Sequence, residues 1–172
     1  AAMIDAKGYK SITSSDRLYL RYRYEDINSD DLIYDYLEGW RQRATLEYRN
    51  ASSKTIKQLF YELELNNRGD LAGSDYSYEY SPTRNSLRGK LTHLLHENWY
   101  ISGDLSYRFS DFPSSPTIDR EDELWKLVLA ADYIIDPSFK LSTKLQFIDN
   151  SSSEERYEYD KSMISVGLIK TF

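Results

Sequence analysis

A strict alternation of apolar and polar residues recurs through most of this chain, and it constrains the fold more than any other feature. Residues 138–148 show it most clearly. One parity holds Phe139, Leu141, Thr143, Leu145 and Phe147, and the other holds Lys140, Ser142, Lys144 and Gln146. Successive side chains of a β-strand point to opposite faces. The segment therefore predicts a strand with one apolar face and one charged face.

Seven further segments repeat this pattern. They are residues 17–25, 38–49, 55–66, 85–96, 98–109, 122–135 and 161–172. Residues 1–12 alternate poorly, which leaves two alternatives for residues 1–16: a lead-in to the strands, or an additional strand. We expect residues 17–172 to form one domain of about eight strands.

The connections between these segments alternate in length. Short turns are predicted at Asn50–Ser53, His96–Asn98 and Asp136–Ser138, and long polar loops at about 26–35, 67–84, 110–121 and 149–160. Transmembrane barrels have short periplasmic turns and longer extracellular loops. The pattern predicts an all-β, antiparallel meander that forms a transmembrane β-barrel in a bacterial outer membrane. An additional strand would make this chain part of a larger barrel, because bacterial single-chain barrels have even strand numbers.

Composition agrees with a barrel and excludes several other classes. No run of 18 apolar residues is present, which excludes a transmembrane helix. Aromatic residues make up 15% of the chain, including 16 Tyr and 3 Trp, which favour membrane interfaces. The absence of Cys excludes a disulfide scaffold, and a net charge of -6 argues against a nucleic-acid partner. The start AAMIDAKG has no signal-peptide pattern, so we expect a mature chain or a segment of a longer one.

The end of the chain carries a motif that concerns its assembly. It consists of the polar residue Ser165, then Gly167 two residues later, then apolar positions and the terminal aromatic residue Phe172. This ending resembles the C-terminal signal of outer-membrane barrels. The resemblance implies recognition of the terminal aromatic by the barrel-assembly machinery. Lys170 departs from the pattern, which prefers an apolar residue there, although a long Lys side chain near the interface can snorkel.

Longer stretches resemble the same class of protein. Residues 147–172, 61–71 and 80–84 are similar to poorly characterised outer-membrane barrel domains, some of them attached to tetratricopeptide repeats, and similar in style to polysaccharide-export barrels. The resemblance implies contact with outer-membrane lipid and lipopolysaccharide, and it leaves room for partners in the periplasm or from other chains. It names no substrate, and we expect no cofactor.

The polar parity holds the residues that would line a lumen. The basic ones are Arg21, Arg23, Arg41, Arg43, Arg49, Arg88, Lys90, Arg108, Lys126, Lys140 and Lys144. The acidic ones are Glu25, Glu47, Glu62, Glu64, Asp104 and Asp132, so this face has a net charge of +5. One hypothesis is a conduit for the export or passage of anionic solutes or polysaccharide. The other is a salt-bridge network that fills a narrow barrel, which eight strands would favour and a larger barrel would not.

Two other classes of function are weaker. Acidic loops could make a surface-binding barrel, but Asp26-x-Asn28-x-Asp30 is followed by Asp31 where a calcium loop needs Gly, so we expect no metal site. A hydrolase would need a general base. The two histidines, His93 and His96, are predicted near the periplasmic end, away from the outer loops, so we expect no enzyme.

Overall fold

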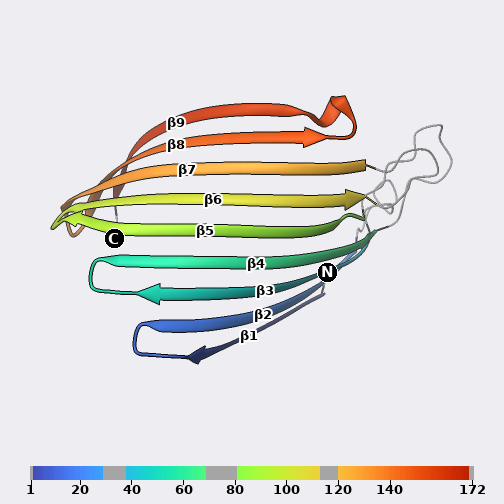
Figure 1. Ribbon diagram of the computed structural model, residues 1–172, viewed down its shortest axis with the longest axis horizontal. Helices are drawn as coiled ribbons and strands as arrows, with labels where there is room; N and C mark the ends of the chain where they lie inside the picture. Colours follow the sequence, from blue (N-terminus) through green and yellow to red (C-terminus); the bar gives the residue numbers. More distant parts are fainter. Residues whose placement is uncertain (1, 29–37, 69–80, 113–119, 171–172) are drawn as a thin grey trace.

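The protein is an all-β antiparallel meander, as the alternation predicts. The computed structural model describes residues 2–28, 38–68, 81–112 and 120–170. Nine strands follow one another in chain order within a single sheet (Figure 1). They are β1 (Ala2–Ser11), β2 (Asp16–Ile27), β3 (Gly39–Ala51), β4 (Thr55–Arg68), β5 (Thr83–His96), β6 (Trp99–Phe112), β7 (Arg120–Asp136), β8 (Phe139–Ser152) and β9 (Tyr159–Lys170). A 3₁₀ turn, η2 (Glu155–Tyr157), lies between β8 and β9.

Residues 2–11 form β1, which is the additional strand of the two alternatives. This strand pairs with β2 so that Asp5 lies opposite Arg23 and Lys7 opposite Arg21. Its alternation is weak because Met3 falls on the polar face and Lys10 on the apolar one. The described ranges therefore contribute nine strands rather than eight.

The connections alternate in length as predicted. Short turns at 12–15, 52–54, 97–98 and 137–138 all lie at one end of the sheet, and the longer connections leave from the other end (Figure 1). The strands extend further toward the longer connections than the sequence suggested. Asp111 and Asp149, assigned to loops above, are strand residues. Polar residues on both faces hide the alternation at these strand ends.

The sheet is open at β1 and β9. Within the described ranges each of these strands pairs with one neighbour, and every pairing is antiparallel, so β1 and β9 run in the same direction. On β9, Ile164 is 72% exposed, whereas Leu145, directly opposite on β8, is 37% exposed. An all-antiparallel closure of this sheet requires an odd number of further strands, because β9 and β1 run in the same direction and the strands placed between them must alternate in direction.

The sheet is a single layer with no covered apolar core. Among the described residues, Phe112, at 7% exposure, and Pro82 are the buried apolar side chains. Large apolar side chains such as Leu59, Leu87 and Leu105 are about half exposed in the middle of the sheet. The backbone ladders of β2 to β8 are paired on both sides within the sheet, but the apolar face meets no other part of the described chain.

Candidate functional site on the polar face of the sheet

The strand register places all eleven predicted basic residues on one face, which we call the polar face. Arg23, for example, lies opposite Arg43, and Arg43 lies opposite Glu64. Further along, Arg88 lies opposite Ser106, which lies opposite Lys126. The polar face divides into two regions with different chemistry.

The first region is a chain of arginine–carboxylate pairs across β1 to β5, which we call the arginine ladder. Its members are Asp5, Arg21, Arg23, Glu25, Arg41, Arg43, Glu64 and Arg84. Asp5 accepts hydrogen bonds from Arg21 Nε and Arg23 Nη2, both at 2.8 Å. On the next strands, Glu25 accepts from Arg41 Nε at 2.7 Å and from Arg43 Nη2 at 2.6 Å.

Glu64 continues the ladder toward β5. It is 7% exposed and accepts a hydrogen bond from Arg84 Nη1 at 2.6 Å and from Asn66 Nδ2 at 2.9 Å. Arg43 Nε lies 3.9 Å from its other oxygen. Each carboxylate of the ladder therefore bridges arginines on its own or neighbouring strands. The space beside Arg21, Arg23 and Arg43 is only about 30 Å³.

The second region lies on β5 to β8, and we call it the lysine groove. Lys90, Lys126 and Lys144 line it together with Arg88 and Asp104. Arg88 Nε donates to Asp104 Oδ1 at 2.8 Å, so the one carboxylate of the groove is already paired. The groove has a volume of about 430 Å³. It is therefore an open space with three lysine charges that Asp104 does not neutralise.

The remaining predicted basic residues lie outside both regions. Lys140 Nζ pairs with Asp132 at 3.1 Å, next to the short turn between β7 and β8. Arg49 lies opposite Arg17 near another short turn. Arg108 lies opposite Ser86 on β5, and its Nε is buried with no hydrogen-bond partner among the described residues. The predicted set therefore shares a face but does not form one site.

Several charged members of this face were not predicted from the sequence, among them Asp5, Arg84 and Arg120. Asp5 lies on the strand whose alternation is weak, and Arg84 and Arg120 lie beyond the predicted strand ends. A usable signal was present, because Arg84, Ser86 and Arg88 keep the same parity and so do Arg120, Asp122 and Lys126. Arg120 stacks over the ring of Phe112, with its Cζ 3.5 Å from the centroid.

Aromatic side chains mark two levels on the opposite, apolar face. Trp99 and Tyr133 pair near the short turns, with ring centroids 4.9 Å apart. Tyr107 and Trp125 pair nearer the longer connections, at 4.7 Å. Trp99 and Tyr107 are eight positions apart, a distance of about 26 Å along β6. If the strand is tilted by roughly 40° from the membrane normal, their separation along that normal is about 20 Å. This separation is comparable to the apolar band of transmembrane barrels, about 25 Å.

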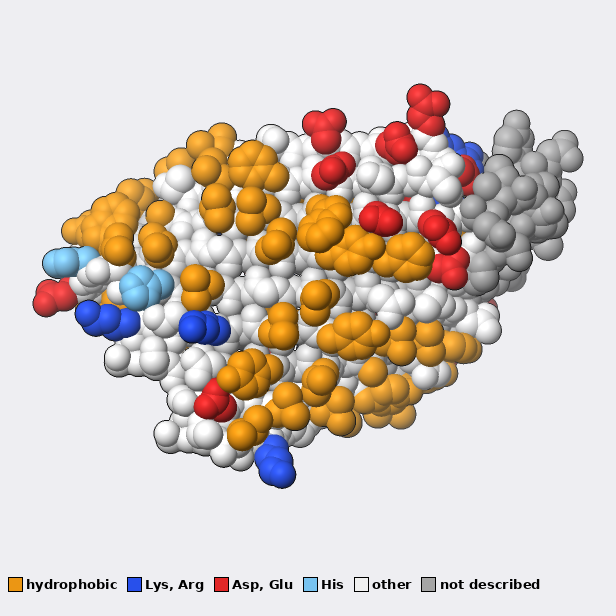
Figure 2. All heavy atoms as spheres, in the orientation of Figure 1, with side chains coloured by type: hydrophobic (Ala, Val, Ile, Leu, Met, Phe, Trp, Pro, Cys, Tyr) orange, Lys and Arg blue, Asp and Glu red, His pale blue; other side chains and the backbone are white. Residues whose placement is uncertain are grey.

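The apolar face changes character beyond the second aromatic level. Apolar side chains cover much of this face in Figure 2, and acidic ones gather toward one end. By register, Asp111 faces Glu121 and Asp149 faces Asp160 at the end nearest the longer connections. Like charges on directly opposite residues are unfavourable unless water screens them. The acidic residues therefore delimit the apolar band.

In the described residues, no group of three or more potential ligands is arranged to hold a metal ion.

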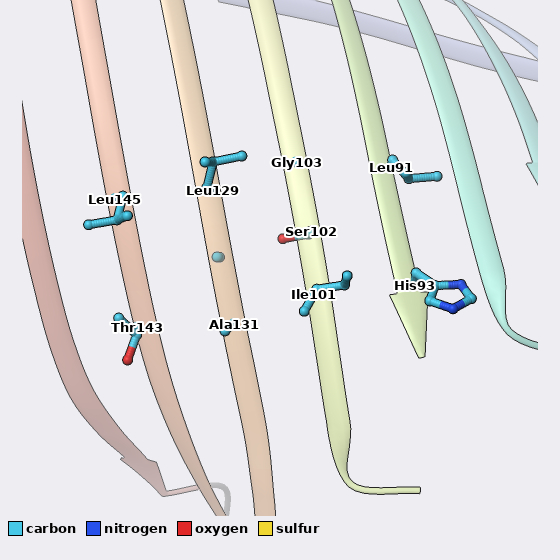
Figure 3. Close-up of a pocket in the computed structure, with 10 residues that line it drawn as sticks. Leu91, His93, Ile101, Ser102, Gly103, Leu129, Ala131, Thr143 and Leu145 are labelled. Atoms are coloured by element: carbon cyan, nitrogen blue, oxygen red, sulfur yellow. The ribbon is translucent and has the colours of Figure 1, made fainter. Parts of the chain in front are cut away.

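A shallow apolar depression lies between the aromatic levels near the short turns. Gly103, Ala131 and Thr143 leave it open between Leu129 and Leu145, with a volume of about 380 Å³ (Figure 3). His93 lies at its rim (Figure 3). The Nδ1 atom of His93 is 2.9 Å from Thr55 Oγ1. His96 is the last residue of β5, beside the turn. Both histidines thus lie near the short turns, as expected.

Asp16, the first residue of β2, carries an ionised carboxylate beside the short turn at 12–15 and precedes Leu18, the first apolar residue of the strand. Asp16 accepts hydrogen bonds from Thr13, Ser15, Tyr48 and Asn50, and these hold its pKa well below the ordinary value. Because the anion is the better acceptor, this arrangement favours the charged form. The cluster joins the turn at 12–15 to β2 and β3 at the short-turn end.

Two of the three residues of the predicted assembly motif lie on β9. Ser165 faces Lys144 and Gly167 faces Ser142 on the polar side of the sheet, whereas Phe172 lies outside the described residues. Lys170 is opposite Phe139 on the apolar face, with its Nζ 5.6 Å from the ring centroid. The departure from the motif thus lies near the short turns.

No protein-family model, curated protein or solved structure matches this chain. Over the part of the chain that is described, no helix is both long and apolar enough to cross a membrane.

Proposed function

We propose that this chain is a segment of an outer-membrane β-barrel that forms a conduit for anionic solutes or acidic polysaccharide. The observation that carries the membrane assignment is the exposed apolar face. Leu59, Leu87 and Leu105 lie in its centre, each about half exposed, on a sheet whose polar groups gather on the other face. A contiguous apolar surface of this extent is unfavourable in water and favourable in lipid.

The aromatic levels support the same assignment. Trp99 and Tyr133 on one side and Tyr107 and Trp125 on the other flank the apolar band, and Tyr and Trp favour the two membrane interfaces. With the short turns in the periplasm, the acidic residues beyond Trp125 would face the outside. Lys170 would then lie at the periplasmic interface, where its charge can reach water.

The strand count favours a conduit over a filled barrel. Eight closed strands leave room for side chains alone, but this sheet has nine strands and remains open. We propose that an odd number of further antiparallel strands completes the barrel, because β1 and β9 run in the same direction. A second copy in the same membrane orientation would pair β9 with β1 in parallel, so further strands of other sequence fit the edges better.

A structural barrel with a filled lumen is the second candidate, and the arginine ladder favours it. Glu25 and Glu64 hold their arginines in a dense network with little space beside it. Such a network would brace one wall and block flow if the opposite wall approached it. The ladder covers β1 to β5, however, and the groove on β5 to β8 stays open.

Single-channel recording in planar bilayers separates the two candidates. The full-length purified protein is added to a bilayer under a KCl gradient, with heat-denatured protein as the control. We expect discrete conductance steps and a reversal potential that shows preference for chloride. A well-folded barrel that stays electrically silent would contradict the conduit and support the filled, structural barrel.

A further inference from the structure

We propose that the lysine groove binds an extended polyanion whose negative charges are separated along the chain, rather than a single compact anion. This inference rests on the proposed function, since it places a binding site on the wall of the proposed conduit. The site consists of Lys90 on β5, Lys126 on β7 and Lys144 on β8.

The first support is the charge balance of the groove. Asp104 lies directly opposite Lys90, but its carboxylate receives hydrogen bonds from Arg88. The nearest carboxylate on β7 toward the short turns is Asp132, which Lys140 holds at 3.1 Å. The polar neighbours Ser102, Ser106 and Gln146 carry no charge. Asp132 also lies close enough to Lys144 for their charges to interact. None of the three lysines, however, has an ion pair or a hydrogen-bonded carboxylate among the described residues, and a ligand can supply one.

The second support is the spacing of the lysines. Lys90 is level with Gln146 across the sheet, Lys126 lies two residues nearer the longer connections, and Lys144 two residues nearer the short turns. With strands about 4.8 Å apart and about 3.3 Å per residue, the backbone positions form a triangle with sides of roughly 12 to 16 Å. One carboxylate or phosphate is too small to meet all three. A polymer that carries separated charges can meet them together.

The third support is the type of side chain. Arginine offers a rigid fork that fixes a carboxylate in two hydrogen bonds, as in the pairing of Arg41 with Glu25. Lysine offers a point charge on a flexible stem, which follows a moving ligand without holding one geometry. The groove also has the necessary room, at about 430 Å³ against about 30 Å³ beside the arginine ladder.

Fluorescence anisotropy with a labelled hexagalacturonate tests this site. The full-length protein is folded in detergent micelles, and binding is compared with that of the triple variant Lys90→Gln, Lys126→Gln and Lys144→Gln. We expect the triple variant to bind about tenfold more weakly, since each screened contact contributes a factor of roughly two. The matched control removes the same charge elsewhere, with Lys10→Gln, Lys54→Gln and Lys57→Gln. Circular dichroism and heat-modified mobility on gels confirm that both variants fold.

Competitors separate the sources of the anion. Inorganic phosphate should not displace the probe at the same total charge, and if it did, the proposal of an extended ligand would be overturned. A short polyphosphate that displaces the probe would support the proposal and identify a phosphate polymer as the better ligand. Equal binding by the wild type and the triple variant would overturn the site.

Hexagalacturonate binding at the lysine groove can be tested separately from ion conduction. Binding in micelles requires no ion flow, so a silent barrel that loses hexagalacturonate in the triple variant would refute the conduit and retain the site. An anion-selective channel whose selectivity and binding both survive the triple substitution would retain the conduit and refute the site.

Discussion

The arginine ladder and the lysine groove lie on the same face of the same sheet, yet they use their charges in opposite ways. In the ladder each carboxylate is shared between arginines, as Asp5 is between Arg21 and Arg23. In the groove three lysines surround one carboxylate that Arg88 already occupies. A basic face is therefore not a uniform surface. Its function depends on whether the cations are fixed by partners within the sheet or left for a ligand.

The largest expected difference between the regions is in stability. Glu25→Gln removes the anion between Arg41 and Arg43, and we expect a loss of about 2 kcal/mol in the free energy of unfolding, because two partly buried guanidinium groups lose their acceptor. Glu155→Gln, an exposed residue of η2, is the control with the same charge change. Urea unfolding in lipid vesicles, followed by tryptophan fluorescence, measures both. If both variants lost the same free energy of unfolding, the ladder carboxylate would stabilise the protein no more than an exposed charge does, which would contradict the prediction.

The second difference is in salt dependence. Raising KCl from about 50 mM to about 500 mM shortens the screening length severalfold, so we expect hexagalacturonate binding at the lysine groove to weaken about fivefold. The free energy of unfolding should change by less than about 0.5 kcal/mol, since the ladder pairs are in direct contact and partly buried. Anisotropy and urea unfolding at both salt concentrations give the comparison. Binding that does not respond to salt would contradict an electrostatic groove.

A third change converts the groove into a ladder. Ser106 lies directly between Arg88 and Lys126, so Ser106→Glu should pair with them and stabilise the protein by about 0.5 kcal/mol. The same change should weaken hexagalacturonate binding about threefold, because the new carboxylate competes with the ligand. Ser106→Gln controls for size. If Ser106→Glu bound the probe as well as Ser106→Gln does, these cations would not belong to the ligand site.

The smallest effect concerns the short-turn end beside the ladder. The pKa of Asp16 is lowered in the folded protein, so its contribution to stability is fully present above its ordinary pKa and is lost as the pH falls through the lowered value. Loss should therefore begin below about pH 4. In the Asp16→Asn variant, the midpoint of unfolding should fall less steeply as the pH decreases on the acid side. Hexagalacturonate binding should stay unchanged. An identical acid profile in wild type and Asp16→Asn would contradict this role.

The sheet itself was predictable because strand alternation is a local property. Segments such as 138–148 give parity, and parity assigns Lys140 and Lys144 to one face whatever their neighbours are. The all-β antiparallel meander and the alternating connection lengths follow from the same signal. The membrane, the conduit and the assembly motif stay predictions.

The division of the polar face was not predictable, because it depends on contacts between strands. Which carboxylate Arg43 meets is decided by the register of β2, β3 and β4, since Glu25 lies diagonally from it and Glu64 directly opposite. Counting charges along the sequence gave the net positive charge of the polar face, but not where on that face the positive charge lacks a partner. Weak alternation in β1 hid Asp5, and Arg84 was missed because the predicted strand started at residue 85, two residues too late.

We propose that the apolar face meets lipid while the polar face lines water, and the tryptophans allow a direct test. Trp40, Trp99 and Trp125 all lie on the apolar face by register. Variants that retain Trp99 or Trp125 alone can be folded into vesicles whose acyl chains carry bromine at a shallow or a central position. We expect brominated lipid to quench the fluorescence of both tryptophans, and bromine at the shallow position to quench it more strongly than bromine at the central position. Fluorescence that no brominated lipid quenches, from a protein shown to be folded, would contradict it.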